Sequence, residues 1–353
     1  MVATYETKTD YKVIGNSPIR HDALDKVTGR AIYGGDVKVP GLIWGDVIRS
    51  PHAHARIKSI DTSAAEAIEG VFAVLTHDDF PQADDKTIDT GEGTVNLRRG
   101  QSNVMADKKV HYKGHVVAAV AAVDRNTAEI AAQSIKVEYE VLPSISDVDA
   151  AMADGAGVIL EGLVGDHLGE KVENTNVARV FRHEFGNVDD AFANSDVVIE
   201  RTVEMSMVHQ GYIEPHNATA IWAQDDNLTV WSSTQGTFGV RSQVAGLLHM
   251  AESKVKVNYV EIGGGFGGKT VVYLAPIAAL LSRKAGGRPV KLIMDRSSVF
   301  EATGPAPGGK IRMKIGVNKD GKIQAADTDL MLEAGGFPGS AVGAAAICVF
   351  ACY

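Results

Sequence analysis

The sequence predicts an α+β protein with two successive regions of strands and helices, residues 13–145 and 181–353, joined by a connecting segment at 146–180. Three observations carry this prediction. Apolar runs of strand length alternate with segments that begin at helix-capping residues. Polar turns in the second region separate strand-like runs. The chain has 353 residues, 45% of them hydrophobic, which is enough for the cores of two or three domains.

In the first region, capping residues and apolar runs predict two helices and three strands. The helices are expected at 63–69 and 128–134, and the strands at 71–75, 116–123 and 136–141. Asn126 and Thr127 are suitable caps for the second helix, because their side chains accept hydrogen bonds from free backbone N–H groups. The order strand, helix, strand between 116 and 141 indicates a crossover unit.

The second region begins after a less regular, glycine-containing stretch at 144–195, which we expect to cross the surface between domains. Two hairpin turns stand out, at 224–227 and 318–321, because Asp, Asn and Gly favour tight turns. Strands are predicted at 197–207, 218–223, 228–233, 254–262, 290–294, 310–317 and 322–333, and helices at 238–250 and 271–285.

Charge and hydropathy exclude several classes of protein. The net charge is −9 and the pI about 5.7, with no long basic run, which argues against a nucleic-acid surface. No apolar run approaches the roughly 20 residues of a membrane span, and the N-terminus lacks the apolar core of a signal peptide. A cytoplasmic location is therefore expected. Residues 334–353 carry no charge, so we expect the chain to stop inside a larger fold or to be completed by a partner.

The two cysteines, Cys348 and Cys352, are expected to be buried thiols. Two ligands at this spacing do not make a closed zinc or iron–sulfur site, and no second pair of cysteines exists. Any iron–sulfur cluster that takes part in the function must therefore lie on another chain.

The most informative stretch is GGGFGGKT at 263–270, with five glycines in six positions between a predicted strand and a predicted helix. Glycines let the backbone approach a ligand closely and direct its N–H groups at anionic oxygens. A tight turn would need only two glycines, so we interpret the loop as a binding site for an anion or a cofactor.

One interpretation of this loop is a nucleotide-binding P-loop. Gly263, Gly268, Lys269 and Thr270 fit the spacing GxxxxGKT, and the strand at 290–294 is followed by an acid, as in nucleotide hydrolases. The pattern is short, and chance matches to it are frequent.

A second interpretation uses more of the chain. GGGFGGK resembles the signature loop of the molybdenum hydroxylases, the group of xanthine dehydrogenase, aldehyde oxidase and carbon monoxide dehydrogenase. Five other segments resemble the same family and occur in its order: DKVTGRAIY at 25–33, RSPHA at 49–53, YEVLP at 139–143, HQGYIEPH at 209–216 and STQ at 233–235. The similarity covers residues 13–353. It implies the N-terminal portion of a molybdopterin-binding large subunit, with an α/β hammerhead-like domain at 13–145 and the incomplete first part of a cofactor-binding domain at 181–353.

The resemblance assigns cofactor contacts to two segments. Gln235 matches a glutamine that hydrogen-bonds an oxygen ligand of molybdenum, a task that suits an amide because it donates without charge. Phe266 and Gly267 match positions that lie against the metal centre and the pterin, with backbone N–H donors available. Gly264 and Gly265 would give the loop its close approach. No residue of this chain is expected to bind the metal directly.

The resemblance also bears on the substrate, for which Thr270 and Phe266 are the candidate contacts. Members that oxidise xanthine have a glutamate at the position of Thr270, and we find no arginine in 297–309 to match the one that positions purines. We therefore expect an aldehyde, an aromatic heterocycle or a thioester-linked aromatic as the substrate, rather than xanthine.

The family hydroxylates carbon with oxygen from water and passes electrons through iron–sulfur clusters to a flavin or another acceptor. Its general base is a glutamate beyond the equivalent of Tyr353, so this chain is expected to be inactive alone. The implied partners are an iron–sulfur subunit, an FAD subunit and a second molybdopterin subunit. The implied cofactor is molybdopterin or its cytosine dinucleotide form. A third hypothesis is an assembly or interaction protein that kept the fold without the cofactor.

Four other residues invite a functional interpretation, but a structural role is favoured for each. Glu214 and His216 share one face of an extended segment, as an acid/base pair would, yet packing or hydrogen bonding is the expected role. His52 and His54 also share a face but have no third metal ligand nearby. Trp222 and Trp231, on either side of the first hairpin turn, are expected to pack in the core.

Overall fold

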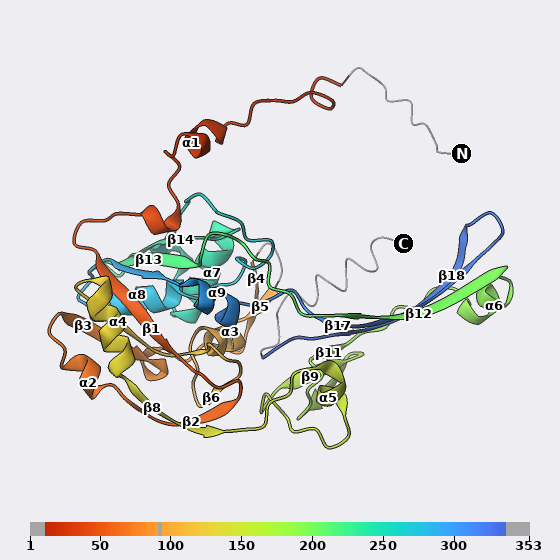
Figure 1. The fold of residues 1–353 in the computed structure, drawn as a ribbon, viewed down its shortest axis with the longest axis horizontal. Helices are drawn as coiled ribbons and strands as arrows, with labels where there is room; N and C mark the ends of the chain where they lie inside the picture. Colours follow the sequence, from red (N-terminus) through yellow and green to blue (C-terminus); the bar gives the residue numbers. More distant parts are fainter. Residues whose placement is uncertain (1–10, 91–93, 337–353) are drawn as a thin grey trace.

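A seven-stranded sheet forms the centre of the computed structural model, which describes residues 11–90 and 94–336 (Figure 1). Both halves of the sequence contribute to this sheet. Its strands, in spatial order, are β15 (Val255–Asn258), β14 (Leu228–Ser232), β13 (Asn217–Trp222), β16 (Val290–Ile293), β1 (Ile43–Arg49), β7 (Val116–Ala122) and β3 (Val71–Thr76). The two regions of the sequence therefore meet at the parallel pairing of β1 with β16.

Strand β7 is buried on both faces, which is why its sequence is an unbroken apolar run. Ala119 and Ala121 face the main core, where helix α8 (Ala275–Lys284) lies. Ala118 and Val120 face a second core with helix α4 (Arg125–Ser134). Small side chains at these positions let a helix approach each face closely.

The prediction of a crossover unit at 116–141 is wrong. Strand β8 (Lys136–Val141) has the expected bounds but lies in a separate three-stranded sheet, with β2 (Ala55–Asp61) and β6 (Lys109–Val110). The expected cap of α4 is wrong as well, since Asp124 accepts the hydrogen bond from the backbone N–H of Thr127 and the helix begins at Arg125. Local sequence predicted the elements but not the sheet that each one joins.

The stretch at 144–195 is more regular than expected. A small sheet forms within it, because β9 (Val164–His167) pairs with β10 (Glu170–Glu173) and β11 (Arg179–Val180). Helices α5 (Val148–Met152) and α6 (Val188–Ala193) stand before and after this sheet, each capped by an Asp or Asn side chain.

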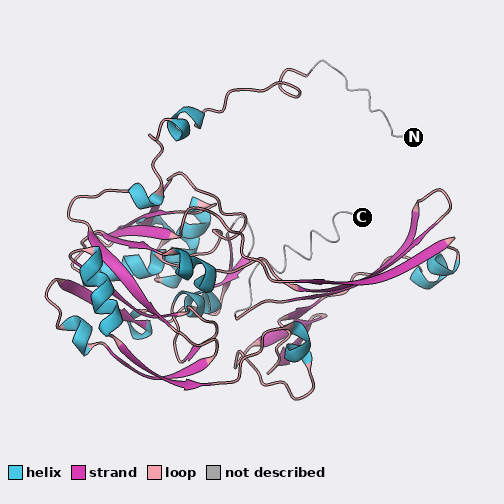
Figure 2. Cartoon of the chain, viewed as in Figure 1, coloured by secondary structure: helices cyan, strands magenta, loops and turns pink. Residues whose placement is uncertain are grey.

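A long antiparallel arm leaves the body of the molecule (Figure 2). It consists of β12 (Val197–Met205), β17 (Gly309–Val317) and β18 (Ile323–Leu332), with β17 in the middle. The turn predicted at 318–321 joins β17 to β18, and the turn predicted at 224–227 joins β13 to β14. Both hairpin predictions are confirmed.

The remaining elements are short or lie beside the central sheet. They are α1 (Ala23–Val27), α2 (Ser63–Glu66), α3 (Leu97–Val104), α7 (Thr237–Leu247), α9 (Arg296–Ala302), β4 (Thr87–Asp89), β5 (Thr94–Asn96) and three 3₁₀ turns, Gly34–Asp36, His77–Asp79 and Glu252–Lys254. Across the described ranges, every helix is too short or too polar to cross a lipid bilayer.

Candidate functional site

The glycine loop at 263–270 is a series of turns rather than a direct link from strand to helix. Strand β15 ends at Asn258, before the predicted 262, and α8 begins at Ala275, after the predicted 271. Within the loop, the N–H of Gly268 donates to the carbonyl of Gly265 at 2.8 Å. Phe266 has a φ of 50°, and its side chain is 73% exposed at the loop tip. A non-glycine residue at positive φ is strained, so the rest of the loop must hold it in place.

Gln235 holds the loop in this shape. Its Oε1 atom accepts hydrogen bonds from the backbone N–H groups of Gly267, at 2.9 Å, and Lys269, at 3.1 Å. Its own backbone N–H donates to the carbonyl of Lys269 at 3.1 Å. A Cβ atom on Gly265 would lie 2.5 Å from Oε1, so only glycine allows the amide to come this close. The STQ segment and the glycine loop, about thirty residues apart in sequence, thus form one unit.

This arrangement leaves a group of donors without partners. Among the described residues, no hydrogen bond reaches the Nε2 amide of Gln235 or the backbone N–H groups of Gly264, Gly265 and Phe266. The N–H of Gly267 differs from these groups, because it donates to Gln235. It is therefore not free to bind a ligand, contrary to what the sequence suggested. Several neutral donors close together suit a ligand rich in oxygen acceptors.

A buried ion pair contacts the glycine loop on its inner side. Lys269 Nζ lies 2.8 Å from Glu214 Oε2, and the two side chains are 0% and 10% exposed. Glu214 also accepts hydrogen bonds from the N–H of Gly263, at 2.8 Å, and from the amide of Asn217, at 3.2 Å. Lys269 stacks over the Tyr212 ring at 4.9 Å. Burial lowers the pKa of Lys269, and the hydrogen bond that Lys269 donates to Glu214 opposes that shift.

A chain of hydrogen bonds continues beneath the ion pair. The Tyr212 hydroxyl lies 2.7 Å from His216 Nε2 and 3.1 Å from the Thr303 hydroxyl, which also meets His209 at 2.8 Å. Burial lowers the pKa of His216 to about 3 and raises that of Tyr212. His216 is therefore neutral near pH 7. The hydrogen-bonding role expected for Glu214 and His216 is confirmed, and they do not act on each other.

Arg296 is a supporting residue that the sequence did not indicate. It donates to the backbone carbonyls of Tyr212, at 2.9 Å, and of Ile213. Thr303 and Tyr273 were also not indicated by the sequence. The hydroxyl of Tyr273 accepts a hydrogen bond from the N–H of Gly304 at 2.8 Å. No local pattern could have revealed these contacts, because each joins residues more than thirty positions apart.

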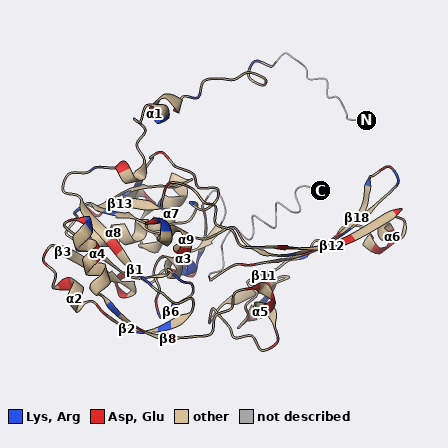
Figure 3. Cartoon of the chain, in the orientation of Figure 1, with Lys and Arg blue, Asp and Glu red and all other residues tan. Residues whose placement is uncertain are grey.

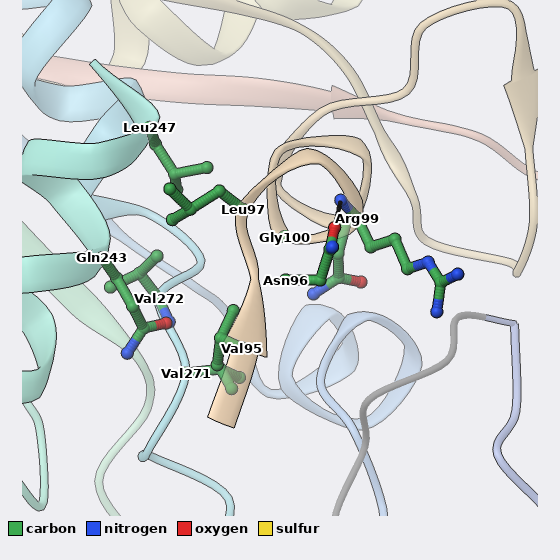
Figure 4. Close-up of a pocket in the computed structure, with 10 residues that line it drawn as sticks. Val95, Asn96, Leu97, Arg99, Gly100, Gln243, Leu247, Val271 and Val272 are labelled. Carbon is green, nitrogen blue, oxygen red and sulfur yellow. Dashed lines mark hydrogen bonds between the residues drawn. The ribbon is translucent and has the colours of Figure 1, made fainter. Parts of the chain in front are cut away.

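Thr270 turns its hydroxyl back onto the loop. The hydroxyl donates to the carbonyl of Gly267 at 3.1 Å, and the Thr270 carbonyl accepts from the side-chain amide of Gln243 at 3.0 Å. A cavity of about 20 Å³ lies beside the next residues, Val271 and Val272, and Figure 4 shows the side chains that line it. That volume holds roughly one water molecule, so it is not a substrate pocket. The substrate contact at Thr270 stays a prediction.

The other candidate residues make hydrogen bonds or packing contacts within the fold. His54 Nδ1 lies 2.7 Å from the carbonyl of Pro143, and the ring of His52 meets Tyr139 edge to face. Trp222 is buried in the main core, as expected, and lies opposite Leu228 rather than opposite Trp231. The two cysteines lie outside the described residues.

Comparison with known sequences identifies the family of the chain. Residues 169–353 match the molybdopterin cofactor-binding domain, and residues 28–143 match the aldehyde oxidase and xanthine dehydrogenase a/b hammerhead domain. The chain belongs to this molybdenum hydroxylase family. Its fold is the family's hammerhead domain followed by the molybdenum-cofactor-binding domain, as the sequence predicted. The exact domain bounds stay a prediction.

Individual members of the molybdenum hydroxylase family match most of the chain. The nicotinate dehydrogenase large molybdopterin subunit of Eubacterium barkeri is 31% identical over 93% of this chain and 72% of that subunit. The carbon monoxide dehydrogenase large chain of Afipia carboxidovorans is 34% identical over 88% of this chain but only 38% of its own length. The structure of reconstituted CO dehydrogenase from Oligotropha carboxidovorans has a TM-score of 0.74 at 31% identity, covering 90% of this chain and 39% of that one.

Family membership and geometry together disfavour the P-loop hypothesis. A P-loop lysine must reach the phosphates of a nucleotide, whereas the amino group of Lys269 is buried against Glu214. The acid after β16, Asp295, caps helix α9 by accepting from the N–H of Ser298 at 2.6 Å. The spacing GxxxxGKT is therefore a coincidence in this molybdenum hydroxylase chain.

Proposed function

We propose that the chain is the molybdopterin-binding component of a molybdenum hydroxylase that oxidises an aldehyde, a heteroaromatic compound or a related small substrate. The reaction inserts oxygen from water into a C–H bond and releases two electrons and two protons. The bound cofactor would supply the two-electron redox chemistry. The observation that carries the proposal is that Gln235 holds the glycine loop in place, while its Nε2 amide and three backbone N–H groups of the loop have no hydrogen-bond partner among the described residues.

The residues of this chain would bind and orient the cofactor. The Nε2 amide of Gln235 would donate to an oxygen of the molybdenum centre, and the N–H groups of Gly264, Gly265 and Phe266 would serve the oxygen-rich cofactor, as molybdopterin or its cytosine dinucleotide. The exposed Phe266 ring would present an apolar edge to the substrate. Thr270 in place of a glutamate favours a less polar substrate than xanthine.

The proposal also covers partners and location. The matching relatives are called large or molybdenum-binding subunits, which supports a complex with iron–sulfur and FAD subunits and a further molybdopterin-binding polypeptide. The general base would belong to that further region, so the chain alone would not turn over. A cytoplasmic location fits these partners.

The test is Gln235→Ala in the complex purified from its native host, with Gln133→Ala on the surface of α4 as the matched control. Gln235→Ala is expected to lower turnover about 10- to 100-fold and to reduce the molybdenum and pterin retained, while subunit composition stays the same. Wild-type turnover and metal content in the variant would remove Gln235 from the site. A wild-type complex with neither molybdenum nor pterin would favour the cofactor-free alternative.

A further inference from the structure

The arm formed by β12, β17 and β18 has two faces of opposite character, because alternate residues of each strand point to opposite sides. Strand pairing places Val203, Ile311 and Leu330 in one row across the sheet. The next residues along, Thr202, Arg312 and Asp329, form a row on the opposite face. The two faces must therefore meet different surroundings.

The charged face is satisfied by its own residues and by the two helices next to it. Arg312 forms ion pairs with Glu200, Asp327 and Asp329 at 2.6–3.1 Å. Phe192 of α6 packs under Lys314 at 4.5 Å. Figure 3 shows acidic and basic residues along the arm. This face needs no further partner.

The apolar face has no such cover within the part of the chain that the structure describes. Hydrophobic residues form most of it, among them Val197, Ile199, Val203, Met205, Ile311, Met313, Ile315, Val317, Ala326, Leu330 and Leu332. Arg201 and Thr328 are the polar exceptions. The four hydrophobic residues of β12 are 39–55% exposed. None of the other described elements covers this face, since the contacts of α6 and the ion pair from Asp149 of α5 are on the charged one.

The base of the arm is joined to the cofactor site. Strand β12 leads through residues 206–208 into the segment 209–216 that carries Tyr212 and Glu214. Strand β17 follows Thr303 and Gly304, which bond to the same segment. A protein seated on the base of the arm would lie next to the glycine loop.

The size of the face indicates how far such a protein must extend. Nine residues of strand span about 30 Å and three strands about 14 Å, which gives a face of about 400 Å². A stable interface needs about 800 Å² from each partner. The partner must therefore also cover surface around the candidate cofactor site, where Ile213, Phe238 and Phe266 are 73–87% exposed.

We infer that the apolar face of the arm docks the remaining region of the molybdopterin-binding subunit, through an apolar surface of that region. The inference rests on the proposed function. The chain matches only 38% of the length of the carbon monoxide dehydrogenase large chain, so such relatives have a further region of sufficient size. Because the arm begins at the cofactor site, a region that completes the site fits better than a second copy of this chain.

The test is photo-crosslinking from the two faces of one strand. Val203→p-benzoylphenylalanine and the matched control Thr202→p-benzoylphenylalanine are introduced into the chain in its native host, and cross-linked peptides of the purified complex are identified by mass spectrometry. Position 203 is expected to cross-link to peptides that align with the part of the large subunits beyond this chain's match, at least tenfold more than position 202.

Three outcomes would overturn the inference: cross-links from position 203 to the arm of a second copy, cross-links mainly to an iron–sulfur or FAD subunit, and equal yields from both positions. Val203→Glu, compared with Thr202→Glu, gives a second readout. Val203→Glu should weaken the docking contact, so that the hydrogen-exchange protection of β17 in the complex falls at least tenfold from its wild-type value. Unchanged protection would count against the inference. Molybdenum analysis of the same sample tests the proposed function separately, since a molybdenum-loaded complex without the cross-link contradicts the docking surface alone.

Discussion

Two sets of ion pairs in this chain differ in burial and therefore in what they do. Glu214 and Lys269 lie under the glycine loop with almost no exposure, and each also contacts residues that hold the loop. Arg312 on the arm has three carboxylate partners, but all four side chains are 31–66% exposed. Water screens the attraction between the charges on the arm. In the buried pair, water cannot reach either charge, so each one is stabilised mainly by the other.

The comparison shows that the number of ion-pair partners of a residue is a poor guide to its contribution to stability. The single buried pair fixes the position of the glycine loop, because moving either group would leave a charge unsolvated in the core. The three exposed pairs mainly keep one face of the arm polar.

The largest effect is expected for Lys269→Met, which leaves the Glu214 carboxylate buried without its cation. The free energy of unfolding should fall by about 3–5 kcal/mol, measured by urea denaturation. The exposed Lys319→Met, whose amino group is 3.9 Å from Asp196, is the control and should change little. A Lys269→Met variant as stable as that control would show that the buried pair is not the stronger one.

A smaller effect for each residue involved is expected from acid. Burial lowers the pKa of His115 and His216 to about 3 and of His111 to about 4, below the value of 6.5 for an unfolded histidine. As the pH falls below 6.5, the unfolded chain binds protons that the folded chain refuses, so stability falls by up to about 1.4 kcal/mol per pH unit for each group. Urea titrations between pH 7.5 and 5 measure this slope.

In that experiment, His216→Gln isolates the contribution of the candidate site to the pH dependence of stability. The variant should reduce the pH dependence by about a third, because two of the three histidines remain. A slope identical to that of the wild type would mean that His216 is accessible to protons, contrary to its burial beneath the loop.

The smallest effect is expected for Arg312→Gln on the arm. The exposed carboxylates around it remain solvated, so the midpoint of urea denaturation should not move measurably at physiological salt. Repeating the measurement at low ionic strength should reveal any residual contribution. A shift as large as that of Lys269→Met would refute the distinction between the two sets.

Local patterns predicted most of the elements but not their partners. Strand β8 has the predicted bounds, since alternating residues report directly on a half-exposed strand. The crossover unit failed because the choice of sheet depends on distant strands such as β1 and β16. Strand β15 and helix α8 are shorter than predicted because the loop between them is held by contacts that periodicity does not report.

At the candidate site, the sequence identified the glycine loop and Gln235 through a family resemblance, but not how they meet. Glycine content indicated a close backbone approach, and at Gly265 the group that approaches is the Gln235 side chain. The supporting residues Tyr212, Arg296 and Thr303 required the folded structure, because each bonds to another segment of the chain.

The position of β1 in the central sheet limits how this gene can be divided. The region that matches the hammerhead domain ends at residue 143, and the region that matches the cofactor-binding domain begins at 169. Strand β1 of the first region nevertheless lies between β7 and β16, and β16 belongs to the second region. A product that started at residue 144 would leave one edge of β16 bare, including the buried Val290 and Leu292, and such an edge is prone to aggregate. The two matched regions are separate in sequence, but they share one sheet and fold as one unit.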